Sequence, residues 1–197
     1  MHDTAAARTD TKSRLLDHAR LLFAQHGYEG VSMRDIAGSV GIRQSAIYNH
    51  FENKQHLLVT LMVTHMEDLL EAMRNAVHDI SDPVERLERF ARFHVSYHIE
   101  KPEHVFLAYM ELRSLGEEGR DAIIPLRDAY EDTLRDILAA GAKTGVFRIS
   151  DAGVVTKGLL AMLTGVTVWF RDGGRLDRDA VAESYVQTVL QAVGAAR

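Results

Sequence analysis

The residues best suited to chemistry with a partner are the polar side chains between positions 43 and 50, where the sequence reads RQSAIYNH. Arginine can pair with guanine or phosphate, and asparagine and glutamine can pair with adenine. A small apolar side chain can touch the methyl group of thymine. We therefore expect this segment to contact duplex DNA, and the candidate residues are Arg43, Gln44, Ser45, Ala46, Tyr48, Asn49 and His50.

Residues 32–51 carry the signals for two short helices that would present this surface. Ser32 suits an N-cap, and Asp35 three residues later makes an arrangement that resembles a capping box. Gly41 stands where a chain leaving a helix often needs a positive φ angle. A second helix is expected over about residues 43–50, with the inward-facing residues of the pair being Ile36, Ala37, Val40, Ile42, Ile47 and Phe51. This arrangement is typical of a helix-turn-helix that lays its second helix in the major groove.

Lys54 lies in the first turn of the next predicted helix, which Asn53 is expected to cap. A cation there faces the positive end of the helix dipole, which is unfavourable unless an anion lies nearby. We therefore predict that Lys54 holds a DNA phosphate, and Ser32 is counted as a further DNA contact.

A third helix is predicted before this pair, over about residues 10–26, because apolar residues recur at helical spacing and Gly27 follows. Residues 10–58 resemble the TetR family of bacterial one-component regulators. The family pattern is a helix ending in F-A-x-x-G-Y, then T/S-x-x-x-I-A, then G-x-x-x-x-x-L-Y-x-H-F-x-x-K-x-x-L. The matching residues are Phe23, Ala24, Gly27 and Tyr28, then Ser32, Ile36 and Ala37, then Gly41, Ile47, Tyr48, His50, Phe51, Lys54 and Leu57.

The resemblance implies an all-α protein with an N-terminal three-helix domain, residues 1–54, that carries the helix-turn-helix. Residues 55–197 would form a helical domain that binds a small effector and makes a homodimer. The implied function is a transcriptional regulator, expected to be a repressor that binds a palindromic operator in double-stranded DNA and is released by the effector. Two departures lie on the reading surface: Arg43 replaces the usual small cap, and Asn49 stands where His or Tyr is frequent. They affect the expected operator sequence and leave the expected fold unchanged.

Charge is distributed unevenly along the chain. The net charge is −5, but residues 1–56 hold seven Lys and Arg against six Asp and Glu, which leaves +1. The acidic excess therefore lies away from the predicted reading surface, and the modest charge at the DNA end favours binding as a dimer. The chain has no cysteine, which excludes disulfides and thiol chemistry. We also expect no apolar run of transmembrane length, no signal segment and a cytoplasmic location.

The remaining residues predict further helices and no strand. The expected ranges are 53–80, 83–100, 103–115, 122–143, 151–170 and 177–195, with a loop at 116–119. The helix over 151–170 is apolar almost all round and would need cover on every side. With the last helix, whose stripe includes Val181, Tyr185, Thr188, Val189 and Ala192, it is expected to form a four-helix dimer interface. The alternative is a central helix buried in a monomer.

Two histidines stand in the apolar arc of the helix predicted over residues 83–100. His94 and His98 each need a buried partner or a ligand there. They could be satisfied core residues, they could line a ligand pocket, or their i, i+4 spacing could serve a metal, although no third ligand has matching spacing. The candidate ligand contacts in the helical core are His65, His94, Tyr97, His98 and Tyr109, and no cofactor or metal is expected.

The segment VWFRDGG at 168–174 resembles the end of a helix in TetR proteins that respond to acyl-coenzyme A thioesters. Trp169, Phe170 and Arg171 are therefore added to the candidate ligand contacts, since an arginine suits a phosphate and aromatic rings suit an acyl chain or adenine. The alternatives are an efflux-pump regulator that binds a hydrophobic drug-like molecule, or a helical metal- or ligand-binding protein that does not bind DNA. An enzyme is not expected, because the sequence has no cysteine nucleophile, no G-x-S-x-G and no phosphate loop.

Overall fold

The computed structural model describes residues 2–195, with side chains from residue 10 onward, and every regular element in this range is a helix. The expected all-α class is confirmed. The chain divides into two compact units, each taken by itself below. Unit 1 contains the residues up to Met66 together with Glu103–Ile124, and unit 2 contains Glu67–Pro102 together with the residues from Pro125 onward.

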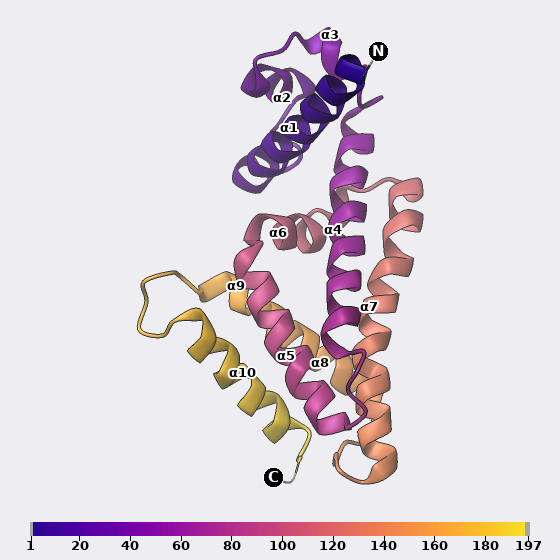
Figure 1. Ribbon diagram of the computed structural model, residues 1–197, viewed down its shortest axis with the longest axis vertical. Coiled ribbons are helices and arrows are strands. Elements are labelled where there is room, and N and C mark those ends of the chain that lie inside the picture. The colour runs from indigo at the N-terminus through magenta and orange to yellow at the C-terminus, as the bar shows by residue number, and fades with distance from the viewer. Residues whose placement is uncertain (1, 196–197) are drawn as a thin grey trace. The chain divides into compact units, whose positions relative to one another are not determined.

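Unit 1 is built on three N-terminal helices, α1 (His2–His26), α2 (Met33–Val40) and α3 (Gln44–Ile47). Helix α1 packs against α2, and α2 packs against α3 (Figure 1). The unit also contains the first part of α4 (Lys54–Val77), then α6 (Pro102–Met110), the short 3-10 helix η1 (Leu112–Ser114) and the start of α7 (Glu117–Thr144). The buried apolar side chains of its N-terminal part include Leu15, Phe23, Ile36, Ile47 and Phe51.

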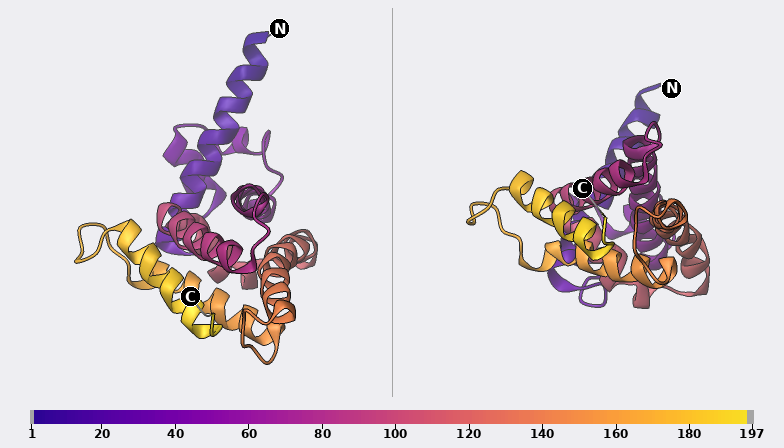
Figure 2. Two further views of the ribbon diagram at one scale, coloured as in Figure 1. Left: turned by 60° about the horizontal axis from the view of Figure 1, so that its bottom comes forward. Right: turned by 90° about the horizontal axis from the view of Figure 1, so that it is seen from below.

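The local signals around α2 have the expected geometry. Ser32 and Asp35 form a reciprocal capping box, and Gly41 adopts a φ of 80° directly after α2. Two predicted lengths among α1, α2 and α3 were wrong, and the helix predicted over 103–115 is α6 followed by η1. Helix α1 begins at His2 rather than near residue 10 and continues beyond α2 and α3 (Figure 2). Helix α3 ends at Ile47, and residues 48–50 continue as turns rather than as helix.

The predicted loop at residues 116–119 was also wrong, because α7 already begins at Glu117. Two acidic residues in the first turn, Glu117 and Glu118, favour a helix start there. Gly119 is a helical residue whose missing side chain is needed: a Cβ there would stand 2.8 Å from a methyl group of Val59 in α4. Further on, Pro125 lies inside α7, where it cannot donate the backbone hydrogen bond of a regular turn.

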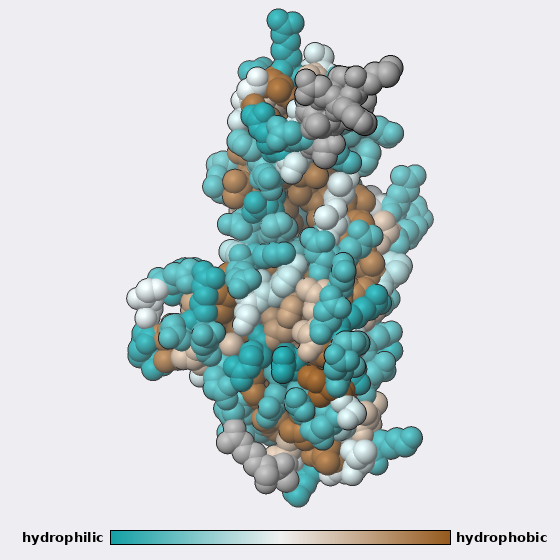
Figure 3. Space-filling model, viewed as in Figure 1, coloured by the Kyte–Doolittle hydropathy of each residue, from teal (hydrophilic) through white to brown (hydrophobic). Residues whose placement is uncertain are grey.

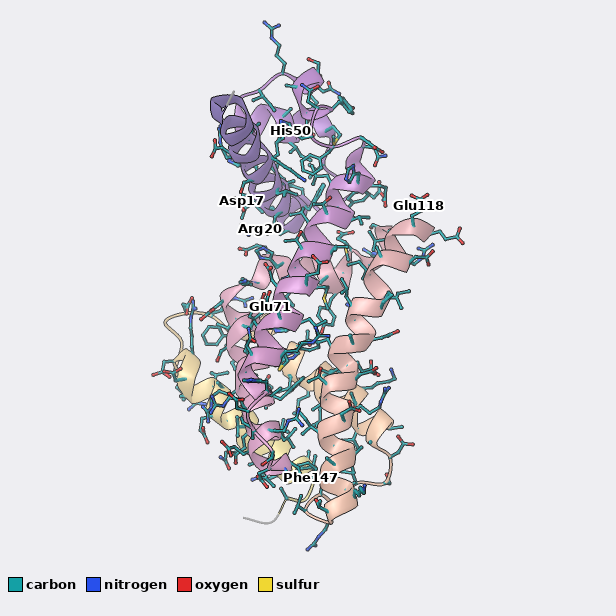
Figure 4. All side chains as sticks on the ribbon, turned by 45° about the vertical axis from the view of Figure 1, so that its right-hand side comes forward. Asp17, Arg20, His50, Glu71, Glu118 and Phe147 are labelled. Atoms are coloured by element: carbon teal, nitrogen blue, oxygen red, sulfur yellow. The ribbon has the colours of Figure 1, made fainter. Side chains whose placement is uncertain are left out.

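Unit 2 is centred on α5 (Pro83–Glu100), which packs against α8 (Ala152–Thr164), α9 (Val166–Trp169) and α10 (Arg178–Ala192) (Figure 2). Helix α5 begins as predicted, with Asp82 as the N-cap and Pro83 in the first turn. Phe147 packs against the end of α7 (Figure 4). Its ring lies so near Gly141 that any side chain at position 141 would collide with it.

The predicted helix over residues 151–170 is two helices, because α8 ends at Thr164 and α9 begins at Val166. One helical stretch of the described chain, Ala152–Trp169, is long and apolar enough by length and composition to cross a membrane. The expectation that no run reaches that length was therefore wrong, since threonines and glycines do not lower the mean hydropathy enough. Only 22% of that stretch is buried within the chain.

Candidate functional site

The predicted reading residues lie together around α3 in unit 1. Five of them are exposed, namely Arg43, Gln44, Ser45, Tyr48 and Asn49, while Ala46 and His50 are half-buried. Arg43 is the N-cap residue but its side chain makes no capping hydrogen bond. The exposed surface of α3 and its flanking residues therefore carries polar groups that could contact base edges.

Buried apolar residues support α3, and a cation on α1 binds the end of α2. Ile47 is 0% exposed and Phe51 is 1% exposed. On α1, Arg14 donates a hydrogen bond from Nη2 to the carbonyl of Val40 at 3.0 Å, which satisfies an acceptor at the end of α2. Arg14 was not among the residues predicted from the sequence, although a cation near a helix C-terminus is a recognisable stabilising signal.

Lys54 has an intramolecular role that its position in the sequence did not reveal. Its ammonium donates to the carbonyl oxygens of Tyr28 at 2.9 Å and of Val31 at 3.0 Å. It also lies 4.1 Å from the centre of the Tyr28 ring, within cation–π range. These groups offset the unfavourable position at the start of α4 without a phosphate, so the predicted phosphate contact stays a prediction that rests on other grounds.

A group of four side chains, called here the Glu111 clasp, joins the turn after α1 to η1. It consists of Tyr28, Gln55, Glu111 and Ser114. Glu111 is 5% exposed, and its carboxylate accepts from the Tyr28 backbone N–H at 3.0 Å and from the Ser114 hydroxyl at 2.6 Å. Gln55 donates to the Tyr28 hydroxyl at 2.9 Å and to the Ser114 carbonyl at 2.6 Å.

Burial raises the pKa of the Tyr28 hydroxyl above 10.0, so the phenol remains protonated at neutral pH. The Glu111 clasp was not predicted from the sequence. Tyr28 belongs to the family pattern, but its partner Glu111 is 83 positions away and nothing local marks the pair.

In unit 2, His94 and His98 are both 0% exposed and their rings stack, with centroids 3.8 Å apart. His94 shares hydrogen bonds with the hydroxyl of Tyr130 at 2.9 Å and the hydroxyl of Thr164 at 3.1 Å. Burial lowers the pKa of His98 to about 4. Burial, followed by repulsion from His98, holds the pKa of His94 well below 6.5. The pair is therefore neutral at pH 7.

The other predicted ligand residues of unit 2 form two separate groups. Tyr97 receives a hydrogen bond from Lys101 at 3.1 Å and lines a cavity of about 270 Å³ with Asp68, Glu71, Ala72 and Asn75. Trp169 stacks on Tyr185 and donates to its hydroxyl at 3.1 Å, while Phe170 lines a cavity of about 430 Å³ at the α9–α10 loop. Arg171 is exposed at the start of that loop, which has a largely hydrophilic surface (Figure 3).

The last two predicted ligand residues lie in unit 1. His65 is 4% exposed, and its ring centroid is 5.2 Å from that of His104. Tyr109 is partly exposed near the end of α6. Among the side chains that the structure describes, no three His, Cys, Asp or Glu residues group closely enough to hold a metal ion.

Small and apolar residues form a line along α8 and α9 that is exposed except at the half-buried Gly165. Val154, Gly158, Ala161, Gly165 and Val168 follow one another at spacings of four and three residues, which places them on one helical face. Val154 is 69% and Val168 is 76% exposed. We call this line the α8–α9 seam. The expectation that Val189 of α10 lies on the same interface was wrong, because Val189 is fully buried.

Two family models match the chain. One, described as bacterial regulatory proteins of the tetR family, matches residues 15–61. The other, described as a tetracyclin repressor-like C-terminal domain, matches residues 80–193.

Individual proteins and structures agree. The HTH-type transcriptional repressor KstR2 of Rhodococcus jostii is 28% identical over 192 residues, which cover 95% of this chain and 93% of that protein. The TetR family transcriptional regulator PfmR from Thermus thermophilus is 34% identical, with a TM-score of 0.81 and coverage of 90% of this chain and 97% of its own. AibR, solved in complex with isovaleryl coenzyme A and operator DNA, is 28% identical with a TM-score of 0.85, over 90% of this chain and 97% of its own. The chain belongs to the TetR family of bacterial regulatory proteins.

Proposed function

We propose that this TetR-family protein is a ligand-responsive transcriptional repressor that binds a palindromic operator as a homodimer in the cytoplasm and leaves it when a small effector binds. The observation that carries the proposal is the exposed polar surface of α3, held from behind by the fully buried Ile47. Direct readout requires such a surface on a rigid support. The repressor KstR2 and the AibR–operator complex lend further support.

The α8–α9 seam supports the homodimer. An exposed line of valine, alanine and glycine permits close helix packing, and it is too apolar to be left in water without cost. A second copy of the same seam, related by twofold symmetry, is the simplest cover. The same assignment accounts for an apolar stretch at Ala152–Trp169 of which little is buried within one chain.

We further propose an acyl-coenzyme A thioester as the effector. AibR was crystallised with isovaleryl coenzyme A, which supports this class over a hydrophobic drug-like molecule. The acyl group would lie among the apolar helices near His94 and His98. The coenzyme phosphates would pair with Arg171, whose side chain is exposed. Residues 1–54 would then carry DNA recognition, and residues 55–197 would carry effector binding and dimerisation.

In vitro selection from a random duplex library tests the proposal, because it requires no assumption about the operator sequence. Wild-type protein should enrich a near-palindromic motif, and its affinity should fall steeply as salt rises. The matched control is a variant in which Gln44 and Asn49 are both alanine, which should not enrich the same motif. Failure of the wild-type protein to enrich any motif would sink the repressor proposal.

A further inference from the structure

Three backbone groups of the turn between α1 and α2 form hydrogen bonds with distant side chains. The Tyr28 N–H is bound by Glu111, and the Tyr28 and Val31 carbonyls are bound by Lys54. Gly27 has a φ of 72°, which ends α1 and turns the Tyr28 N–H away from the helix. A buried N–H without an acceptor is costly, so the acceptor on Glu111 favours this conformation of the turn.

Glu111 supplies that partner from the end of α6. Its two oxygens are used by two different segments, Oε1 by Tyr28 and Oε2 by Ser114. Gln55 completes a second link between the same segments, since it donates to the Tyr28 hydroxyl and to the Ser114 carbonyl and accepts from the Gly116 N–H at 3.1 Å. The start of α4, the α1–α2 turn and η1 therefore form one hydrogen-bonded group.

From this group we infer that Glu111 is a positioning residue for DNA recognition, although it lies far from α3 in the sequence. The inference rests on the proposed function. Helix α2 begins directly after the turn that Glu111 fixes, and α3 packs on α2. The clasp thus sets the orientation from which α3 meets the bases.

Loss of the clasp should affect specific and non-specific binding differently. Phosphate attraction is electrostatic and tolerates a shifted helix, because every cation of the surface is retained. Hydrogen bonds to base edges need the side chains close to their ideal positions. The ratio of affinities for a selected duplex and a scrambled one should therefore fall, whereas a residue that only stabilised the fold would leave this ratio unchanged.

The test measures that ratio for four variants, Glu111→Ala, Glu111→Gln, Ser114→Ala and Glu118→Ala. The duplexes are those selected by the wild-type protein, and each protein concentration is corrected for the folded fraction. Glu118 is the matched control because it is an exposed glutamate of the same unit (Figure 4). We expect the ratio to fall about tenfold in Glu111→Ala, the scale of one lost base contact. Glu111→Gln should recover most of it, because the amide oxygen can still accept from Tyr28.

Ser114→Ala should lower the affinity ratio by a smaller factor. If Glu111→Ala does not fold, the ratio of Ser114→Ala tests the inference instead. Glu118→Ala should match the wild-type protein. A wild-type ratio in folded Glu111→Ala would overturn the inference, as would a wild-type ratio in Ser114→Ala when Glu111→Ala does not fold. An equal loss in the glutamine and alanine variants would overturn the hydrogen-bond role. Failure of the wild-type protein itself to select any duplex would instead remove the proposed function.

Discussion

Single residues in unit 1 divide between those that face a partner and those that hold the backbone. The exposure of Arg43, Gln44, Ser45, Tyr48 and Asn49 agrees with the surface expected from the sequence, while their contact with DNA stays a prediction that rests on base and phosphate chemistry. The capping roles of Ser32 and Asp35 could be predicted because the two residues are neighbours. The intramolecular bonds of Lys54 could not be predicted from sequence alone, since its acceptors, the Tyr28 and Val31 carbonyls, become neighbours only in the folded unit.

Replacement of Gln44 or Asn49 by alanine should change which operator sequence is preferred. Each lost base contact should cost about 1–3 kcal/mol at one operator position, with little effect at others. Parallel selections with the wild-type protein and each variant would measure the preference. Asn75→Ala, an exposed change on α4 in unit 2, is the control. An unchanged preference in both reading variants would show that α3 does not read bases.

The buried histidine pair predicts a loss of stability in acid. The pKa of His98 is about 4 in the folded chain and lies near 6.5 when unfolded. Below about pH 6.5 the unfolded chain therefore takes up a proton that the folded chain does not, and the free energy of unfolding falls as the pH drops towards 4. For His98 alone the loss at about pH 5 should be about 2 kcal/mol.

Urea unfolding at about pH 7.5 and about pH 5 measures this loss. His98→Phe keeps a planar ring and should reduce the difference between the two pH values, while His94 still contributes in the same direction. Equal pH dependence in the wild-type protein and the variant would mean that His98 is not buried in its neutral form.

At the scale of elements, helix positions followed from apolar spacing, and helix ends were found where a cap or glycine marks them. The ends that were missed have other causes. The start of α7 was placed too late because Gly119 was taken for a loop residue, whereas it allows α7 to approach Val59 closely. Val189 was assigned to an interface because a stripe on a helix does not reveal which neighbour covers it; α5 packs on α10 within the same chain.

A charge on the α8–α9 seam should dissociate the dimer without unfolding the chain. Val168→Glu would place a carboxylate in the apolar seam of each protomer, and Val168 is 76% exposed within one chain, so little packing is lost. Sedimentation at micromolar concentration should give a dimer for the wild-type protein and a monomer for the variant. Ala139→Glu, an exposed change on α7, should remain dimeric. A wild-type monomer would rule out the seam as a dimer interface.

For the whole molecule, the central question is how a ligand changes DNA binding. Only a ligand with different affinity for two arrangements can shift the balance between them. The predicted ligand residues fall into separate groups, with His94 and His98 in a neutral core and Arg171 on an exposed loop. The acyl chain of a thioester suits the neutral core, and its charged coenzyme suits the exposed loop. A free acid has the acyl chain but lacks the coenzyme.

Titration of the protein–DNA complex should therefore separate thioesters from free acids. Isovaleryl, long-chain and sterol-derived coenzyme A thioesters should be compared with their acids, and release by a thioester should require less ligand than release by its acid. Arg171→Ala should weaken thioester binding about tenfold and leave DNA affinity without ligand unchanged. Arg175→Ala is the control on the same exposed loop. Equal release by acid and thioester would exclude a coenzyme contact.

The chain crosses between its two compact units three times, and this limits where a chimera of two such regulators can be joined. The chain changes unit after Met66, after Pro102 and after Ile124, so no single cut separates the residues that complete unit 1. A chimera joined at residue 54 would place a foreign turn and a foreign Tyr28 position against the resident Glu111 and Ser114. Exchange of operator specificity between homologues should therefore succeed when the donor's α6–α7 corner, residues 103–124, travels with its first 66 residues. A chimera that exchanges only the amino-terminal segment would pair the donor's α1–α2 turn with the recipient's Glu111 and Ser114.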